Sequence, residues 1–185
     1  RRLYRDTSAV LSPPVPAVGE ARDLVAPGPA GPIPLRLYRG LTTAADAALP
    51  VLVYFHGGGW TIGDLETHDI ICRTLANNAR CAVIAVDYRM GPEHRFPAAV
   101  EDCIAATRWV AAQGTSIGVD AGRIAVGGDS AGGNLATVAA IALRDAGGPP
   151  LVFQALVYPA TDQRRNSASH GRLGEGYLLT RNNML

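Results

Sequence analysis

The sequence predicts an α/β protein built on a mostly parallel, doubly wound sheet with helices on both faces. Two apolar runs, residues 50–55 and 81–86, are continuous rather than alternating, which is typical of strands buried on both faces. A third short apolar run, 123–126, precedes a long stretch of alanine and leucine that is typical of a helix. Repeated alternation of strands and helices favours parallel strands joined by helical crossovers.

Local signals along the chain predict the individual elements. Residues 1–11 are expected to be the end of a helix, because the proline-rich segment that follows cannot continue one. Residues 22–25 and 33–38 flank a loop, 27–32, which predicts an antiparallel hairpin at a sheet edge, where proline is tolerated. Beyond residue 162 the chain is polar and irregular. The other expected elements are helices at 69–79, 98–114 and 136–146, and strands at 50–55, 81–86, 123–126 and 152–158.

Composition limits the classes of protein to which this chain can belong. With 185 residues, 48% of them hydrophobic, the chain can form one globular domain with a real core. A net charge of +1 without a dense basic run gives no electrostatic case for nucleic acid. No apolar run approaches the roughly 20 residues of a membrane span, and because no apolar segment follows the charged residues 1–6, we expect no signal peptide. Three cysteines without zinc spacing predict reduced thiols, no metal site and a cytoplasmic protein.

Ser130 is the candidate nucleophile. It lies between the predicted strand and helix, with Gly128 and Gly132 two positions to either side, in the Gly-x-Ser-x-Gly pattern of a nucleophile elbow. Such a turn is too tight for flanking β-carbons, and we expect the serine backbone to be strained. The serine hydroxyl would then be exposed at the carboxyl end of the sheet, over a helix N-terminus that can stabilise a developing oxyanion.

A second glycine cluster follows the strand at 50–55, where residues 56–60 read His-Gly-Gly-Gly-Trp. Consecutive glycines at a strand end suggest either a flexible turn or a backbone that must approach a ligand closely. Paired with the serine elbow, they favour an oxyanion loop whose N–H groups point at a substrate carbonyl oxygen. A dinucleotide fingerprint is excluded because the third glycine, Gly63, comes one residue too late, and no Gly-Lys-Ser/Thr sequence indicates a phosphate loop.

These motifs, with three others, resemble a known family, the bacterial hormone-sensitive-lipase-like carboxylesterases of the α/β-hydrolase fold. The matching segments are 56–60, 87–94 (Asp-Tyr-Arg-Met-Gly-Pro-Glu-His), 128–134 (Gly-Asp-Ser-Ala-Gly-Gly-Asn), 158–162 and 176–180. The resemblance runs from about Arg22 to the last residue. It implies that Ser130 is the nucleophile and that the N–H groups of Gly58, Gly59 and Ala131 form the oxyanion hole. It also implies hydrolysis of short-chain, small-molecule esters through an acyl-enzyme, without a metal or an organic cofactor.

The chain also departs from the family pattern, which places the acid and the histidine of the triad on later strands. We therefore expect a truncated α/β-hydrolase fold lacking the last strands and most of the cap. Residues 1–21 would be a remnant of the N-terminal cap, 22–162 an incomplete core, and 163–185 the start of the cap. Alone, the chain should be feebly active, with the strand at 152–158 unpaired on one side. Its partner would be a second copy or the missing C-terminal portion of the same protein.

The histidines of the chain are not expected to complete the triad. His56, together with Gly57, belongs to the oxyanion loop and is expected to shape it. His68 and His94 precede Ser130 in sequence, and we interpret them as loop or supporting residues.

Other acidic residues and one histidine leave an alternative open. Asp162 and His170 follow the nucleophile in the order that a triad requires, but one ends the neighbouring strand and the other lies in the polar segment. Asp129 is expected to point away from the serine and to be structural. Glu101 and Asp102 are expected on a solvated helix face.

Two other functions remain open from the sequence. Plant gibberellin receptors resemble the same family and bind a ligand without turnover, so a receptor or pseudoenzyme is one alternative. The intact glycine loop and serine argue against it, because an oxyanion hole has no purpose in a binder. An amidase or formamidase using the same elbow is the other.

Overall fold

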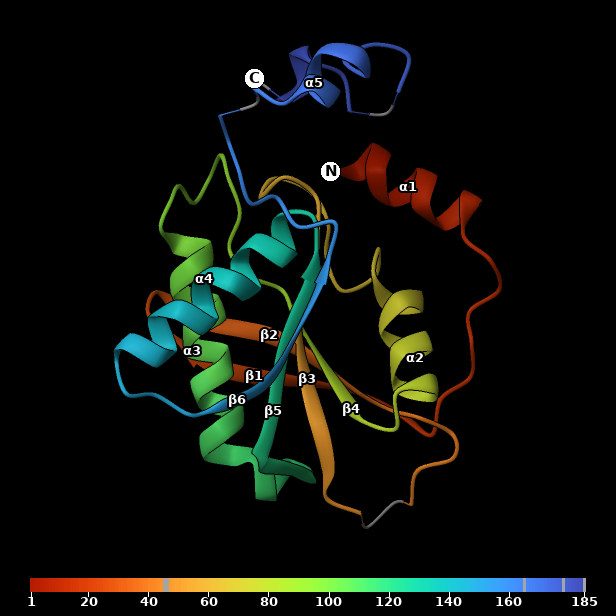
Figure 1. Ribbon diagram of the computed structural model, residues 1–185. Coiled ribbons are helices and arrows are strands. Elements are labelled where there is room, and N and C mark those ends of the chain that lie inside the picture. Colours follow the sequence, from red (N-terminus) through yellow and green to blue (C-terminus); the bar gives the residue numbers. More distant parts are fainter. Residues whose placement is uncertain (45–46, 165, 178, 185) are drawn as a thin grey trace.

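The computed structural model describes residues 1–44, 47–164, 166–177 and 179–184. Within them, one six-stranded mixed sheet has the order β1-β2-β4-β3-β5-β6 (Figure 1). The helices and strands in chain order are α1 (Arg2–Leu11), β1 (Glu20–Gly28), β2 (Gly31–Arg39), β3 (Leu49–Phe55), α2 (Asp69–Asn78), β4 (Ala82–Val86), α3 (Ala98–Gln113), β5 (Val119–Asp129), α4 (Ala131–Asp145), β6 (Leu151–Val157) and α5 (Ala168–Arg172). Short 3₁₀ turns lie at Gly114–Ile117 and Asn182–Met184.

The predicted mostly parallel sheet with an antiparallel N-terminal hairpin is confirmed. β3 pairs in parallel with β4 and β5, and β5 pairs in parallel with β6. The hairpin β1–β2 runs antiparallel and joins the sheet through β4. Its strands continue to the pair Gly28–Gly31, so the loop expected at 27–32 is instead a two-residue turn. Gly31 has φ +138°, a conformation that lets the chain reverse this sharply.

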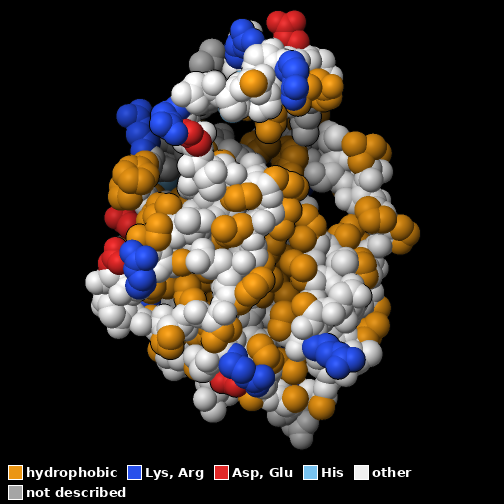
Figure 2. Space-filling model, viewed as in Figure 1, with side chains coloured by type: hydrophobic (Ala, Val, Ile, Leu, Met, Phe, Trp, Pro, Cys, Tyr) orange, Lys and Arg blue, Asp and Glu red, His pale blue; other side chains and the backbone are white. Residues whose placement is uncertain are grey.

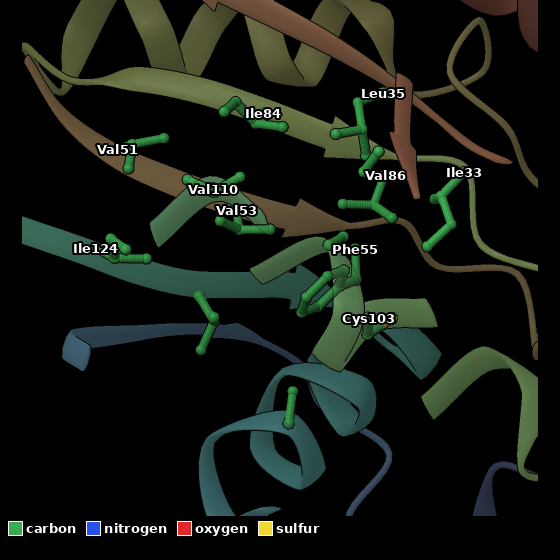
Figure 3. Packing of buried hydrophobic residues seen from close by; sticks show 14 of the residues in the cluster. Ile33, Leu35, Val51, Val53, Phe55, Ile84, Val86, Cys103, Val110 and Ile124 are labelled. Atoms are coloured by element: carbon green, nitrogen blue, oxygen red, sulfur yellow. The ribbon is translucent and has the colours of Figure 1, made fainter. Parts of the chain in front are cut away.

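Helices cover both faces of the sheet, as predicted, and each face has its own core. Val51, Val53 and Phe55 of β3 pack with side chains from α3 and α4 (Figure 3). Leu52 and Tyr54, which alternate with them, pack on the opposite face with residues of α2. This period-two alternation of an unbroken apolar strand is what burial on both sides requires.

Two elements, β5 and α4, begin at least four residues earlier than the sequence predicts. β5 begins at Val119, in a stretch expected to be a turn before residue 123. α4 begins at Ala131 rather than 136, because Gly132 and Gly133, poor helix formers, are held in the first turn by close packing. The C-terminal segment is irregular as expected, although it contains α5, and Thr180 Oγ1 accepts a hydrogen bond from Asn183 N in its last short turn. None of the described helices is long and apolar enough to cross a bilayer.

The prediction that Asp102 lies on a solvated helix face is wrong. This residue of α3 is 1% exposed, and its two carboxylate oxygens accept hydrogen bonds of 2.8–3.0 Å from the guanidinium of Arg89. One oxygen also accepts the Arg89 backbone N–H at 2.9 Å. Asp102 precedes Cys103 and lies four residues before Ala106, both buried, so helical spacing places it on the core face. The neighbouring Glu101 is exposed, as predicted.

Within the described residues, the strand at 152–158 is unpaired on one side, as predicted. Among the described strands, β6 lies at the end of the sheet beside β5. Val152 and Phe153 are 59% and 66% exposed, which is unusual for large apolar side chains in a strand. Figure 2 shows a band of hydrophobic side chains over the part of this face where β6 lies. The edge therefore presents both open backbone groups and apolar surface.

We predict that Asp102→Ala lowers the free energy of unfolding by about 3 kcal/mol, because it leaves the partly buried Arg89 guanidinium without the buried carboxylate that pairs with it. Urea unfolding monitored by circular dichroism measures the change. Glu101→Ala is the matched control, since Glu101 contacts the same guanidinium from an exposed position, and it should change stability by less than about 0.5 kcal/mol. Equal losses of stability in the two variants would show that the buried ion pair contributes no more to stability than the exposed one.

Candidate active site

Ser130 occupies a strained turn between β5 and α4. Its φ of 52° and ψ of −113° lie outside the regions that a serine normally adopts, which confirms the predicted strain. The turn is held by backbone hydrogen bonds on both sides of the residue. Ser130 N donates to Val157 O at 3.0 Å, and Ser130 O accepts from Asn134 N at 3.1 Å and Ala160 N at 3.0 Å.

The flanking glycines are required because the elbow packs directly against the end of β3. A β-carbon at Gly128 would lie 2.2 Å from Phe55 O, and one at Gly132 would lie 1.8 Å from the same oxygen. Both distances are far below van der Waals contact with backbone that cannot move aside. The prediction that the turn excludes β-carbons is therefore confirmed, and Phe55 is the residue that excludes them.

The glycine loop that follows β3 adopts backbone conformations that favour glycine. Gly58 has φ +120° and Gly59 has φ +59°, and Trp60 also has a positive φ of 57°. Gly58 O accepts hydrogen bonds from the N–H groups of the next turn, at 3.1 Å from Thr61 and 3.0 Å from Ile62. Within the part of the chain that the structure describes, the N–H groups of Gly58 and Gly59 have no acceptor.

Ala131 adds another available donor. It is the first residue of α4, and the first N–H groups of a helix have no partner within it. The loop after β3 and the first turn of α4 therefore bring backbone donors, with the positive end of the α4 dipole, to the side of the sheet where Ser130 lies. Such an arrangement can stabilise negative charge that develops on a substrate oxygen.

A buried polar cluster lies behind the glycine loop. Asp129 Oδ1 accepts hydrogen bonds from the Tyr54 hydroxyl at 2.7 Å and from Gly57 N at 2.9 Å, and His68 Nε2 lies 3.5 Å from it. Burial alone raises the pKa of Asp129, but hydrogen bonds from His68 and Tyr54 outweigh it, so the pKa lies below its ordinary value. The carboxylate is directed toward β3, and Ser130 is not among its described hydrogen-bond partners.

His56 is buried in the same region, at 3% exposure. Its ring stacks on Tyr88 with centroids 4.3 Å apart, and the Tyr88 hydroxyl donates to His56 O at 2.7 Å. His56 Nδ1 lies 2.8 Å from Gly57 O, which fits a neutral ring that donates from Nδ1. Burial lowers the pKa of His56 to about 4. The ring thus packs against the backbone of the glycine loop, and Ser130 is not among its described hydrogen-bond partners.

The remaining histidines make no described hydrogen bond to Ser130. His68 Nδ1 lies 3.0 Å from Thr67 Oγ1, and its other nitrogen faces Asp129. His94 is exposed. The alternative pair makes no described hydrogen bond to Ser130 either: Asp162 forms a 2.6 Å ion pair with Arg164, and His170 Nδ1 contacts Ser167 Oγ at 2.6 Å. Among the described residues, no three His, Cys, Asp or Glu side chains are grouped so that they could hold a metal ion.

An apolar pocket of about 380 Å³ lies beside the glycine loop, within the range of small-molecule sites. Its walls come from Trp60 and Thr61, from Leu135 and Val138 of α4, and from Val100 of α3. Sequence reasoning missed this pocket because its walls come from separate segments. The only local signal was the large side chain of Trp60 directly after three glycines.

The fold and the serine elbow together define an α/β hydrolase. The sequence model of the family described as alpha/beta hydrolase fold matches residues 52–185, and the chain belongs to this family. The predicted resemblance to its bacterial carboxylesterases is confirmed by the relatives.

Two curated relatives are from Mycobacterium tuberculosis (strain ATCC 25618 / H37Rv). The chain is 58% identical to Esterase LipI over 139 residues, which are 75% of this chain and 43% of that protein. It is 48% identical to Carboxylic ester hydrolase LipN over 167 residues, covering 88% of this chain and 44% of that protein. A solved ester hydrolase from the metagenome of Lake Arreo, complexed with a bipyridine phosphonate derivative, is 49% identical with a TM-score of 0.95. That match covers 100% of this chain and 58% of the solved one. The chain thus spans less than half the length of these two curated relatives.

We predict that His56 makes the fold less stable in mild acid. Because its pKa is about 4 when folded and 6.5 when free, the unfolded chain takes up the proton first. Its contribution to the free energy of unfolding is full above pH 6.5, falls as the pH decreases and is lost near pH 4. The expected loss between pH 7 and pH 4.5 is roughly 2–3 kcal/mol, measured by urea unfolding.

The control variants separate this histidine from the others. His56→Gln should remove most of the decrease, even if it lowers stability at pH 7. The exposed His94→Gln should retain it. A decrease of the same size in His56→Gln would rule out burial of the neutral ring as its cause.

Proposed function

We propose that the protein is a carboxylic ester hydrolase acting on small-molecule esters, with Ser130 as the nucleophile. The observation that carries this proposal is the strained Ser130 turn, which packs against the last residue of β3. The glycine loop follows directly after that strand, and two of its N–H groups have no acceptor in the described chain. The names of the relatives, an esterase and a carboxylic ester hydrolase, support the same class of reaction.

The reaction follows from the roles of these groups. Ser130 Oγ attacks the ester carbonyl carbon, and the carbonyl electron pair moves onto oxygen. The N–H groups of Gly58, Gly59 and Ala131 hold the resulting oxyanion, a contribution of about 10²–10³ in rate for each strong donor. Collapse of the intermediate expels the alcohol and leaves the acyl group on Ser130, and attack by water then releases the acid.

The proton of Ser130 requires a base, and we infer that its imidazole lies outside this sequence. All four histidines of the chain are within the described residues, and each is engaged elsewhere or exposed. A covalent mechanism without an oriented imidazole retains only about 10³–10⁴ over water, from the oxyanion hole and binding. We therefore expect these 185 residues by themselves to hydrolyse esters feebly.

Two other expectations from the sequence also stay predictions. They are the division of the chain at residues 21 and 162, and a cytoplasmic location.

We predict that Ser130→Ala lowers kcat for 4-nitrophenyl butyrate in the active protein by on the order of 10⁴-fold or more, because it removes the attacking oxygen. The measurement is paired with labelling by a fluorophosphonate, which should modify the protein only when Ser130 is present. His170→Ala, tested alongside, should change kcat little. A large loss in His170→Ala would instead assign the base to His170, with Asp162 as its partner.

A receptor or pseudoenzyme would show no turnover, and an amidase or formamidase would prefer amide substrates.

We also predict a preference for acyl chains of roughly eight carbons or fewer. The expectation comes from the resemblance to short-chain carboxylesterases, and the confined volume of about 380 Å³ beside the glycine loop is compatible with it. The measurement compares kcat/KM for 4-nitrophenyl butyrate and palmitate, each below its critical micelle concentration. Faster hydrolysis of the palmitate ester would contradict the prediction.

A further inference from the structure

We propose that Asp129 is a positioning residue. By accepting the Gly57 N–H, it fixes the position of the glycine loop, and so of the loop's N–H donors, relative to Ser130. This inference rests on the proposed function, because the loop matters only if its donors stabilise an oxyanion. It assigns a role to the residue directly before the nucleophile, whose side chain has no part in the chemical steps described above.

The first support is where strand pairing stops. The ladder between β3 and β5 ends at the pair Phe55–Gly128. Beyond it, β3 continues into the glycine loop and β5 continues into the elbow, so no further backbone pairing holds the two together. The 2.9 Å hydrogen bond from Gly57 N to Asp129 Oδ1 takes over at this point. A side chain of β5 thus extends the ladder by one bond, between the last residue before Ser130 and the second residue of the loop.

The second support is close packing between the same two residues. A β-carbon at Gly57 would lie 2.1 Å from Asp129 Oδ2 and 3.0 Å from Asp129 O. Gly57 does not need its glycine for a positive φ, since it is not among the positive-φ residues. Its lack of a side chain therefore serves the approach of the carboxylate, and Gly57 and Asp129 fit each other as a pair.

The third support is that the carboxylate is itself fixed. Asp129 is 8% exposed, and the Tyr54 hydroxyl at 2.7 Å and His68 Nε2 at 3.5 Å hold its carboxylate from the α2 side of the sheet. Moving a buried carboxylate away from its hydrogen-bond donors is energetically unfavourable, because the charge would then be buried without partners. The carboxylate is therefore a rigid acceptor, whereas Gly58 and Gly59, the next two residues of the loop, have no described acceptor to hold their N–H groups.

We predict that Asp129→Ala lowers kcat about 10- to 100-fold in the active protein, with little change in KM, because a donor misplaced by about 1 Å can cost 10²-fold. Asp129→Asn keeps an oxygen acceptor for Gly57 N and should restore most of kcat. Asp69→Ala is the matched control, since Asp69 is equally buried and also accepts a tyrosine hydroxyl, from Tyr38 at 2.9 Å, but does not contact the glycine loop. Its kcat for the folded fraction should stay within about twofold of the wild type.

Amide hydrogen exchange gives a readout that does not depend on activity. The Gly57 N–H should exchange at least about tenfold faster in Asp129→Ala, and at the wild-type rate in Asp69→Ala once global stability is matched with urea. Unchanged kcat in Asp129→Ala, or an equal loss in Asp69→Ala, would overturn the inference. If the wild type neither hydrolyses esters nor reacts with a fluorophosphonate, the proposed function fails. In that case the exchange of Gly57 alone decides whether Asp129 holds the loop, and an unchanged rate refutes it.

Discussion

The site depends on one steric constraint, the contact between the elbow and the carbonyl oxygen of Phe55. Neither Gly128 nor Gly132 could carry a β-carbon without meeting that oxygen. The contact brings the last residue of β3 directly under the elbow, so the glycine loop starts within one residue of the nucleophile turn. A larger residue at either glycine would separate β3 from α4. The glycines of the Gly-x-Ser-x-Gly pattern therefore serve the packing of two strands and a helix as much as the strain of the serine.

Two buried carboxylates also hold loops of the fold in fixed positions. Each joins a strand or helix to a loop: Asp129, the last residue of β5, joins that strand to the loop after β3, and Asp102, within α3, joins that helix to the segment after β4. Each accepts a backbone N–H as well as side-chain donors. A buried charge is costly unless it is satisfied in this way, so both loops are tied at one defined point. At the carboxyl ends of parallel strands, where ladders stop, such side-chain ties replace the missing backbone pairing.

Much of the fold could be predicted from the sequence, because the central strands are long, apolar and bounded by clear turn signals. The elbow and the glycine loop were predictable for a different reason, since glycine is common only where a β-carbon is excluded or φ is positive. The prediction is wrong for Asp102, because its spacing from the buried Ala106 places it on the core face of α3 although it is charged. It missed the start of α4, since helix propensity disfavours Gly132 and Gly133 while tertiary packing requires them. The pocket beside Trp60 could not be predicted, because no local pattern indicates which distant segments meet.

The strain at Ser130 also explains why β6 matters to the chemistry although it contributes no reacting group. Holding a serine at φ 52° costs on the order of 1–3 kcal/mol, and the surroundings must offset it. Part of that support comes from β6 and the residues after it, because Ser130 N donates to Val157 O and Ala160 N donates to Ser130 O. Asn134 Nδ2 of α4 secures the same segment through Ala160 O at 2.9 Å. Yet among the described strands β6 is an edge strand, and its apolar side chains Val152 and Phe153 are exposed. Anything that covers this edge would reduce the freedom of Val157, and through it would stabilise the strained backbone of the nucleophile.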